Sequence, residues 1–322
     1  MFWESIFSIN KNNLEQRVEV VRSIKVDKNN FLLDPENFDL AIKLGDGYLD
    51  IGSYKESEYY YKKAESLKPN DLKSHEKLAF LYRYQNLFVE SEKEFKKQLE
   101  IDPKNSYIYV DMGKLYRNWG KFEEAKKMFE TAIQIDPNND NAYGYGLGYL
   151  YRDMGDLKTA EKYFLKAFQL KQSDFNYGAL GDIYRDSGKY KDSEKMFKKS
   201  IEINPMGEDY GGLAWLYFEE KRYKEAEEQF NNYLKIVRPK AEIYNALAQT
   251  LIAQKKYKEA ELANKKALDL NPKELNFYDT MAQIYSLTSK KYLEEAVRSR
   301  QKIIINNMNW EDKVTKLYSN NI

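Results

Sequence analysis

Apolar residues recur three and four positions apart in short blocks along most of this chain, with Lys, Glu, Asp and Asn between them. This spacing places the apolar side chains on one face of an α-helix and the polar ones on the other. The blocks come in pairs, and Gly, Asn or Pro stands between successive blocks. The pattern therefore predicts pairs of amphipathic helices, each of which has to bury its apolar face against a neighbour.

The pairs repeat about every 34 residues. In each first helix a Leu or Met precedes Gly or Ala, and a Tyr follows four positions after the Leu or Met in all pairs but one. These leading residues are Leu44, Leu78, Met112, Leu147, Leu180, Leu213, Leu247 and Met281. The steps between them are 34, 34, 35, 33, 33, 34 and 34 residues. So regular a period indicates a tandem array in which neighbouring pairs stack to bury a shared core.

The turns of each pair also follow the period. Four turns carry Gly, which suits a left-handed helix end: Gly52, Gly120, Gly155 and Gly188. The same turn position holds Asn86, Lys221, Lys255 and Ser289 in the other pairs. Of these, Asn tolerates the left-handed conformation best. Most second helices are followed by Pro, which cannot continue a helix, and Asn or Asp at the junctions can cap the next helix.

These residues resemble the tetratricopeptide repeat family over roughly residues 38–305. The match rests on Leu-Gly-x-x-Tyr in the first helix, a small residue and an aromatic in the second, and the closing Pro. The resemblance implies an all-α, right-handed superhelical solenoid of about eight antiparallel helix pairs, whose first helices line a concave groove. The predicted units start near residues 38, 72, 106, 141, 174, 207, 241 and 275.

Both ends depart from the repeat. Residues 1–37 are predicted to form an N-terminal helical cap, with a helix over residues 14–25 that turns Val18, Val21 and Ile24 inward. A ninth, eroded repeat is the alternative interpretation. Residues 306–322 are predicted to form a C-terminal capping helix.

Composition removes several classes of function. The chain carries 52 Lys and Arg against 51 Asp and Glu, a net charge of +1, whereas nucleic-acid binders usually show a basic excess. It has no Cys, and its one histidine, His75, faces the partner helix, so no second His can complete a base or metal pair. We therefore expect neither enzyme activity, cofactor nor metal. The first residues do not read as a signal peptide and no long apolar run occurs, so a cytoplasmic location without membrane insertion is expected.

One position of the first helices carries a row of Arg. The residue after the Tyr is Arg83, Arg117, Arg152 and Arg185 in four consecutive pairs. Two interpretations remain open. The row is either a solvated face neutralised by acids such as Asp182, three residues before Arg185, or a site for an acidic segment. For the other three arginines the same-face neighbours are Phe80, Lys114 and Tyr149, with no acid at that spacing, which favours the site.

Glycines and aromatics gather beside this row in the fourth to sixth pairs. Gly178 and Gly211 fall on the predicted groove face, near Tyr145, Trp215 and Phe218. Because Gly inside a helix costs about 1 kcal/mol relative to Ala, it needs a cause. Gly either leaves room for a ligand side chain under an aromatic wall or relieves crowding among neighbouring tyrosines.

The sequence thus predicts a protein-interaction scaffold that binds a protein or peptide, acidic and with aromatic or apolar anchors, in the groove. The predicted site residues are Phe80, Arg83, Lys114, Arg117, Tyr145, Tyr149, Arg152, Gly178, Asp182, Arg185, Gly211, Trp215 and Phe218. A self-associating homo-oligomeric array, or the recognition arm of an enzyme on another chain, are the alternatives. Nucleic-acid binding is not expected.

Overall fold

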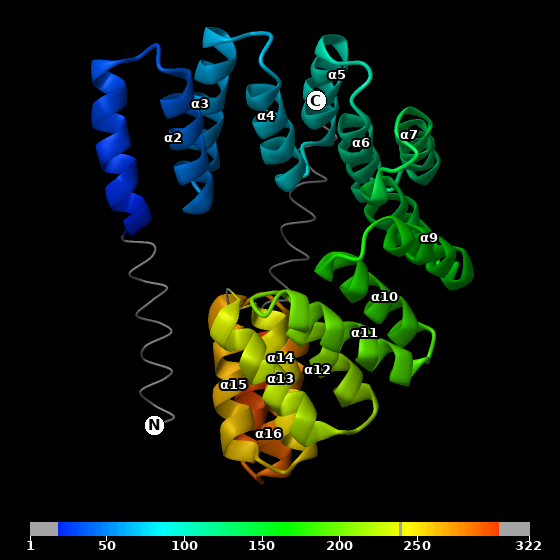
Figure 1. The fold of residues 1–322 in the computed structure, drawn as a ribbon. Coiled ribbons are helices and arrows are strands. Elements are labelled where there is room, and N and C mark those ends of the chain that lie inside the picture. Colours follow the sequence, from blue (N-terminus) through cyan, green and yellow to red (C-terminus); the bar gives the residue numbers. More distant parts are fainter. Residues whose placement is uncertain (1–18, 238–239, 303–322) are drawn as a thin grey trace, which may run out of the picture. The chain divides into compact units, whose positions relative to one another are not determined.

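The structure, a computed structural model, describes residues 19–237 and 240–302, and these residues form helices joined by short turns (Figure 1). No strand occurs among them. The chain forms two compact units that divide between Lys171 and Gln172, and each is described by itself. The all-α prediction of stacked antiparallel helix pairs is confirmed in both units.

Unit 1 contains four helix pairs, preceded by a helix over residues 19–33. The pairs are α2 (Phe38–Asp50) with α3 (Tyr54–Leu67), α4 (Leu72–Tyr84) with α5 (Phe88–Ile101), α6 (Ser106–Asn118) with α7 (Phe122–Ile135), and η1 (Ala142–Gly148) continuing into α8 (Tyr149–Asp153) with α9 (Leu157–Leu170). Within unit 1 each second helix packs on its own partner and on the first helix of the next pair.

Unit 2 repeats this arrangement. Its pairs are α10 (Asp174–Asp186) with α11 (Tyr190–Ile203), α12 (Asp209–Glu219) with α13 (Tyr223–Ile236), α14 (Ala241–Ala253) with α15 (Tyr257–Leu270), and α16 (Leu275–Leu287) with a helix from residue 291 to the last described residue, 302. The first helices of both units begin within two residues of the predicted unit starts.

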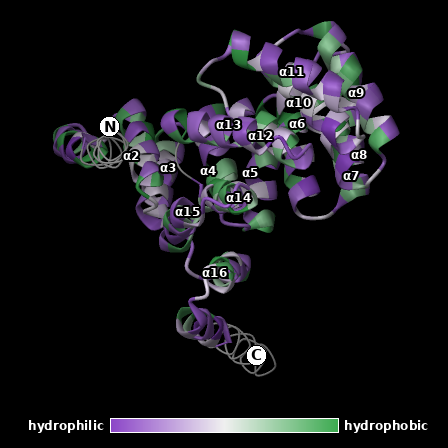
Figure 2. Ribbon diagram, turned by 90° about the horizontal axis from the view of Figure 1, so that it is seen from below, coloured by the Kyte–Doolittle hydropathy of each residue, from purple (hydrophilic) through white to green (hydrophobic). Residues whose placement is uncertain are grey.

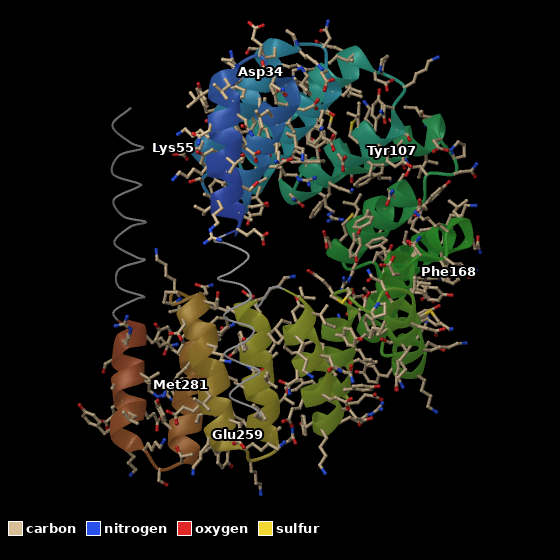
Figure 3. The ribbon with its side chains drawn as sticks, turned by 60° about the vertical axis from the view of Figure 1, so that its left-hand side comes forward. Asp34, Lys55, Tyr107, Phe168, Glu259 and Met281 are labelled. Carbon is tan, nitrogen blue, oxygen red and sulfur yellow. The ribbon has the colours of Figure 1, made fainter. Side chains whose placement is uncertain are left out.

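The core of each pair comes from the repeated residues. Hydrophobic and hydrophilic residues are mixed within every helix (Figure 2), because one face is buried and the other is solvated. In the second pair Leu78, Ala79 and Phe95 are fully or almost fully buried. Burying one such large side chain stabilises the fold by about 1.5–3 kcal/mol. Figure 3 shows the same contrast at single residues, since Met281 lies inside unit 2 whereas Tyr107 is exposed.

The small residue after the leading Leu or Met makes this core possible. A Cβ atom on Gly113 would lie 2.4 Å from the ring of Phe129, in the second helix of the same pair. The two helices therefore approach closely only because this position carries no side chain, and the Phe ring fills the space that is left.

The turn within each pair adopts the left-handed conformation that the sequence predicts. Positive φ angles of 71–81° occur at Gly52, Gly120, Gly155 and Gly188. The four residues that replace Gly adopt it too, with φ near 60°: Asn86, Lys221, Lys255 and Ser289. Helix starts are capped as expected at Asp71, Asn105 and Asn139, whose side chains accept hydrogen bonds from the N–H groups of the following turn.

A repeated hydrogen bond ties neighbouring pairs together. The Tyr of a first helix donates its hydroxyl to a Glu on the second helix of the preceding pair. The bonds are Tyr82 to Glu58 at 2.8 Å, Tyr116 to Glu92 at 3.1 Å, Tyr217 to Glu194 at 2.9 Å and Tyr285 to Glu261 at 3.2 Å. Burial and the bond to Glu58 raise the pKa of Tyr82 to about 12. Where the seventh pair has Leu251 in place of Tyr, Gln254 donates to Glu227.

The fourth pair contains a π-helix. Its leading residue, Leu147, follows the previous one by 35 residues, one more than the usual step, whereas Pro103 and Pro137 are 34 apart. The extra residue therefore lies between Pro137 and Leu147, and residues 142–148 form the π-helix η1. A one-residue insertion into an α-helix is accommodated as a π-bulge. The residues after η1 therefore keep the same buried and exposed sides as in the other first helices.

The N-terminal segment differs from the prediction. The helix runs to residue 33 rather than 25. Ile24 is buried as predicted, but Val21 is exposed, and the inward residues are instead Asp27 and Phe31. Lys43 of α2 pairs with Asp27 at 2.8 Å, which explains an acid at the inner face. Val18 and the predicted C-terminal capping helix over 306–322 lie outside the described residues. Among the described helices none is both long and apolar enough to span a bilayer.

Candidate functional site

The predicted site residues of unit 1 come together on its first helices. We call this set the cationic face and define it as Phe80, Arg83, Lys114, Arg117, Tyr145, Tyr149 and Arg152. They lie on α4, α6, η1 and α8, the first helices of three consecutive pairs. Stacking of these helices brings side chains that are about 34 residues apart in the sequence next to one another.

Cations and rings pair throughout the cationic face. The ammonium of Lys114 lies 4.8 Å from the ring centre of Tyr145 in the next pair. The guanidinium groups of Arg117 and Arg152 lie 5.4 and 5.8 Å from the ring of Tyr149. Contacts of this length are favourable by about 0.5–1 kcal/mol each at exposed sites. These contacts hold the long Lys and Arg side chains against the helices. The side chains therefore lose less conformational entropy when a ligand binds.

Phe80 supports Arg83 in the same way, at 5.0 Å. Phe80 and Tyr149 are themselves backed by core rings, since Phe80 packs edge-on against Phe95 and Tyr149 against Phe164. The aromatic members of the face are therefore fixed by the core beneath them.

The expectation that the arginines of unit 1 have no acidic partner is wrong for Arg117. Its Nε lies 3.4 Å from a carboxylate oxygen of Asp153, on the first helix of the following pair. Its Nη1 also donates to the backbone carbonyl of Tyr145 at 3.0 Å. Spacing within one helix could not reveal Asp153, because this acid comes from a neighbouring repeat. Lys114 likewise pairs with Asp111 at 3.1 Å.

Arg83 differs from Arg117 in its partners. Its Nη1 is buried and has no hydrogen-bond partner among the described residues. Burial lowers the pKa of Arg83, Asp111 opposes this shift, and the like charge of Arg117 adds to it. Burial also lowers the pKa of Arg117, against the influence of Asp153 and Tyr149. Both groups remain cations at neutral pH, and an added anion would relieve the cost of holding them together.

In unit 2 the predicted ion pair of Arg185 with Asp182 is present. Arg185 lies 3.1 Å from Asp182, as the spacing predicts. It also reaches Asp186 at 3.2 Å and Glu219 at 3.8 Å. Although adjacent residues of a helix point apart, the long guanidinium side chain of Arg185 turns back to reach Asp186. Arg185 thus belongs to an internal ion-pair cluster.

The remaining predicted residues of unit 2 contribute to packing. Trp215 contacts Phe218 and the core ring of Phe230 at centroid distances of 5.7 and 5.6 Å. Both Trp215 and Phe218 are half-buried against the core. Gly211 is buried, and a Cβ atom there would lie 3.2 Å from the ring of Tyr233.

The hypothesis that Gly178 leaves room for a ligand is wrong. Its side-chain space is occupied by the carboxyl of Asp209, which would lie 2.2 Å from an added Cβ atom. The Asp209 carboxyl in turn lies 2.6 Å from the hydroxyl of Ser200, which donates to the carbonyl of Asp174 at 2.8 Å. Burial raises the pKa of Asp209 to about 6, the Ser200 bond opposes the shift, and Asp182, Asp174 and Glu208 add to it.

Two other glycines from the same stretch have a packing role. Added Cβ atoms on Gly146 and Gly212 would lie 2.6 and 2.4 Å from Phe129 and Phe197 of the preceding second helices. Core rings therefore account for these glycines, and neither the ligand hypothesis nor crowding among tyrosines is needed for them.

A hollow of about 500 Å³ lies elsewhere in unit 1, on the fourth pair. It is lined by Tyr143 and by α9 residues, among them Lys162, Tyr163 and Lys166. None of the predicted site residues lines it.

The stacked helix pairs, their Gly-containing turns and the Tyr–Glu bonds between them define a helical-repeat protein. Sequence models described as tetratricopeptide repeat match residues 38–71, 106–139, 145–174, 176–205 and 212–274. The chain belongs to the tetratricopeptide repeat family. No curated protein matches it.

Solved structures share the fold at low sequence identity. Yeast Tom70 is 19% identical with a TM-score of 0.65, over 91% of this chain and 62% of that chain. The APC/C hetero-tetramer Cut9–Hcn1 is 17% identical with a TM-score of 0.63, over 85% and 54%. The human IFIT1 dimer with m7Gppp-AAAA is 17% identical with a TM-score of 0.58, over 91% and 78%. The chain thus spans less than two thirds of the Tom70 and Cut9–Hcn1 chains that it matches.

Proposed function

We propose that this chain is a protein-interaction scaffold whose cationic face holds an acidic segment of a partner protein. The tetratricopeptide repeats support a scaffold role in general, and the chemistry of the face supports the nature of the segment. One observation carries the proposal. The buried Nη1 of Arg83 has no hydrogen-bond acceptor in the described part of the chain, and the guanidinium of Arg117 lies near it as a second positive charge.

A carboxylate matches this arrangement better than other ligands. A guanidinium group binds a carboxylate through two parallel hydrogen bonds. The rings of Phe80, Tyr145 and Tyr149 line the same face and offer contacts for an apolar side chain next to the acid. The proposed segment therefore combines Asp or Glu with an aromatic or aliphatic anchor.

The charges around the face argue against a polyanion such as a nucleic acid. Asp111 and Asp153 are interspersed among the cations of the face, each within 3.4 Å of one of them. A continuous phosphate backbone would meet these carboxylates at every step, whereas a peptide can place its few acids beside Arg83 alone. The balanced charge of the whole chain agrees with this choice.

The proposal is tested with labelled peptides of about twelve residues and fluorescence anisotropy at low and high salt. One peptide is acidic with a single Phe, a second has Gln and Asn in place of its acids, and a third carries Lys instead. We expect the acidic peptide to bind best, and to lose at least ~10-fold in affinity in the Arg83→Ala, Arg117→Ala, Arg152→Ala chain, since hydrogen bonds to charged groups contribute about 1.5–3 kcal/mol.

A matched control removes the same charge elsewhere. Lys55, Lys93 and Lys127 are exposed on the second helices α3, α5 and α7, and their triple Ala variant should bind like the unchanged chain. Equal binding of all three peptides would show that the acids of the segment are not recognised. Equal losses in the two triple variants would show that net charge and not this face determines binding.

A further inference from the structure

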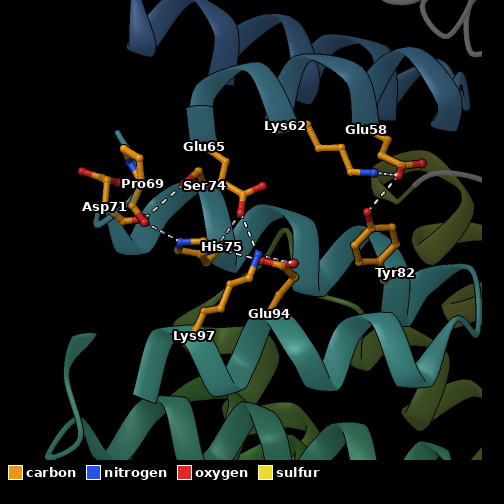
Figure 4. Close-up of polar contacts among 10 residues, drawn as sticks. All are labelled: Glu58, Lys62, Glu65, Pro69, Asp71, Ser74, His75, Tyr82, Glu94 and Lys97. Atoms are coloured by element: carbon orange, nitrogen blue, oxygen red, sulfur yellow. Dashed lines mark hydrogen bonds and ion pairs between the residues drawn. The ribbon is translucent and has the colours of Figure 1, made fainter. Parts of the chain in front are cut away.

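A polar cluster lies between the first two helix pairs (Figure 4). His75 of α4 is 2% exposed and Glu94 of α5 is 8% exposed. The His75 Nδ1 lies 2.8 Å from Glu94 Oε2 and 3.8 Å from Glu65 Oε1 of α3. Three helices thus bring one imidazole and two carboxylates together inside unit 1.

Hydrogen-bond accounting fixes the state of the imidazole. The His75 Nε2 lies 2.8 Å from the carbonyl oxygen of Pro69. A carbonyl only accepts, so Nε2 carries a proton and donates it. In the neutral ring Nδ1 then holds a lone pair directed at the carboxylate of Glu94. Two lone pairs 2.8 Å apart repel each other, so either a proton or a metal ion has to lie between them.

The other repeats show that His75 does more than bind a carbonyl. Tyr109 and Tyr278 occupy the same repeat position and donate to the carbonyls of Pro103 and Pro272, at 3.1 and 2.9 Å. Tyr therefore performs the structural role of His75 in other pairs. What His adds is a second polar atom, Nδ1, aimed at the two carboxylates.

The two glutamates also depart from the repeat. At the position of Glu65 every later pair up to the seventh has a large apolar residue: Leu99, Ile133, Phe168, Ile201, Leu234 and Leu268. At the position of Glu94 the first pair has Tyr60, and the third to seventh pairs have Met128, Tyr163, Met196, Gln229 and Ala263. The three ligand-type residues thus replace tyrosine and mostly apolar residues together, at one junction of the array.

A cation already bridges the two carboxylates. The ammonium of Lys97 lies 2.7 Å from Glu65 Oε1 and 3.1 Å from Glu94 Oε1. Its side chain is 43% exposed, so it can turn into solvent without moving the backbone. Lys is common at this position, for example at Lys63, Lys166 and Lys266, so Lys97 is not particular to the cluster as Glu65, His75 and Glu94 are.

We propose that Glu65, His75 and Glu94 form a binding site for a divalent transition-metal ion, with zinc as the best match. One ligand atom from each lies within 4.8 Å of the other two, a span that zinc with bonds of about 2.0–2.2 Å closes by small side-chain rotations. The bond from Nε2–H to a backbone carbonyl is the arrangement that orients metal-binding imidazoles. Zinc would displace Lys97 and link α3, α4 and α5.

The single histidine makes the site directly measurable. Untagged chain is freed of metal and titrated with zinc against a chromophoric chelator, while ring ¹⁵N signals of His75 are followed by NMR. We expect saturation at one zinc per chain, a large shift of Nδ1, and an Nε2 that keeps its proton. Thermal unfolding should move to higher temperature with zinc and return with EDTA.

Two variants and one control separate the site from incidental binding. His75→Tyr keeps the bond to Pro69 that tyrosine makes in other repeats and should weaken zinc binding at least ~10-fold. Glu65→Leu with Glu94→Met copies residues found at these positions in other pairs and should do the same. Glu58→Gln, which removes a carboxylate bound to Lys62 on the same helix and to Tyr82 on α4, should leave zinc binding unchanged.

Absence of saturable binding, or zinc binding that survives His75→Tyr, would overturn the proposal. The cluster would then be a network of hydrogen bonds and ion pairs only.

Discussion

At the scale of single residues, the hydrogen bonds around Asp209 depend on whether its carboxyl group is protonated. The Ser200 hydroxyl lies within hydrogen-bond distance of both the Asp174 carbonyl and the Asp209 carboxyl, yet it has one proton to donate. Both bonds form together only when Asp209 is protonated and donates to Ser200. Burial is the main cause that raises the pKa of Asp209 to about 6, and the nearby acids Asp182, Asp174 and Glu208 add to it.

The stability of the fold should therefore fall as the pH rises past this group. Asp209 has a pKa of 3.8 as a free residue and about 6 in the fold, so the folded state favours the protonated form. The stabilisation is complete below pH 3.8 and is lost as the pH rises through 6. At about 1.4 kcal/mol per unit, the loss at pH 7 is at most about 3 kcal/mol, and partial exposure of Asp209 reduces it.

Asp209→Asn removes this ionisation and keeps a donor for Ser200. We expect the variant to be more stable than the natural chain at pH 7 by about 1–2 kcal/mol and equally stable near pH 4. Chemical denaturation at several pH values measures both differences. Glu100→Gln, on the exposed face of α5, is a control for the loss of one charge. A variant less stable at pH 7 would show that the ionised carboxylate is the form that the fold uses.

At the scale of elements, some turns between paired helices hold a non-glycine residue in a strained backbone conformation. Lys221 and Lys255 hold φ angles of 61°, a conformation that costs a residue with a Cβ atom roughly 1–2 kcal/mol. Glycine adopts it freely, although its unfolded state has more entropy to lose.

Lys221→Gly and Lys255→Gly should each raise the free energy of unfolding by about 0.5–1 kcal/mol. Asn86→Gly should change it little, because Asn tolerates this conformation. Lys224→Gly, in the exposed face of α13, should instead lower it by about 1 kcal/mol. Urea denaturation of the four variants distinguishes relief of strain from a general effect of Gly, which would give all of them the same sign.

The π-helix η1 makes a second prediction at this level. Deleting one residue from an α-helix rotates everything beyond it by about 100° and moves core residues to the surface. Within η1 the deletion should only restore the ordinary 34-residue step. We expect a chain without Gly144 to unfold cooperatively with stability close to that of the natural chain, whereas deletion of Val110 in α6 should cost several kcal/mol. Thermal unfolding followed by circular dichroism compares the two. Equal losses would mean that η1 does not absorb the extra residue.

For the molecule as a whole, the fold could be predicted well from the sequence because residues with the same structural role recur in every repeat. The positions of Leu44, Gly113 and Phe129 recur at a fixed period, so their packing could be inferred without coordinates. The left-handed turn is kept even at Lys221, which departs from the Gly pattern and which alone would not suggest one.

The candidate site was harder to predict because partners come from different repeats. The Arg row was visible in the sequence, but Asp153 beside Arg117 and Glu219 beside Arg185 lie on the following first helices. The space beside Gly178 was also misjudged, since its occupant, Asp209, is 31 positions away in the sequence. A comparison of equivalent repeat positions would have revealed Glu65 and Glu94 as unusual residues. Considering His75 alone does not point to these two glutamates.

The Tyr–Glu bonds between pairs have a direction along the chain. In each of them the acceptor precedes the donor by 23 or 24 residues, as in Glu58 with Tyr82 and Glu194 with Tyr217. During synthesis the glutamate of one pair therefore leaves the ribosome before the tyrosine that will bind it. The glutamate of each such pair therefore gains its tyrosine partner only after roughly two dozen more residues have been made.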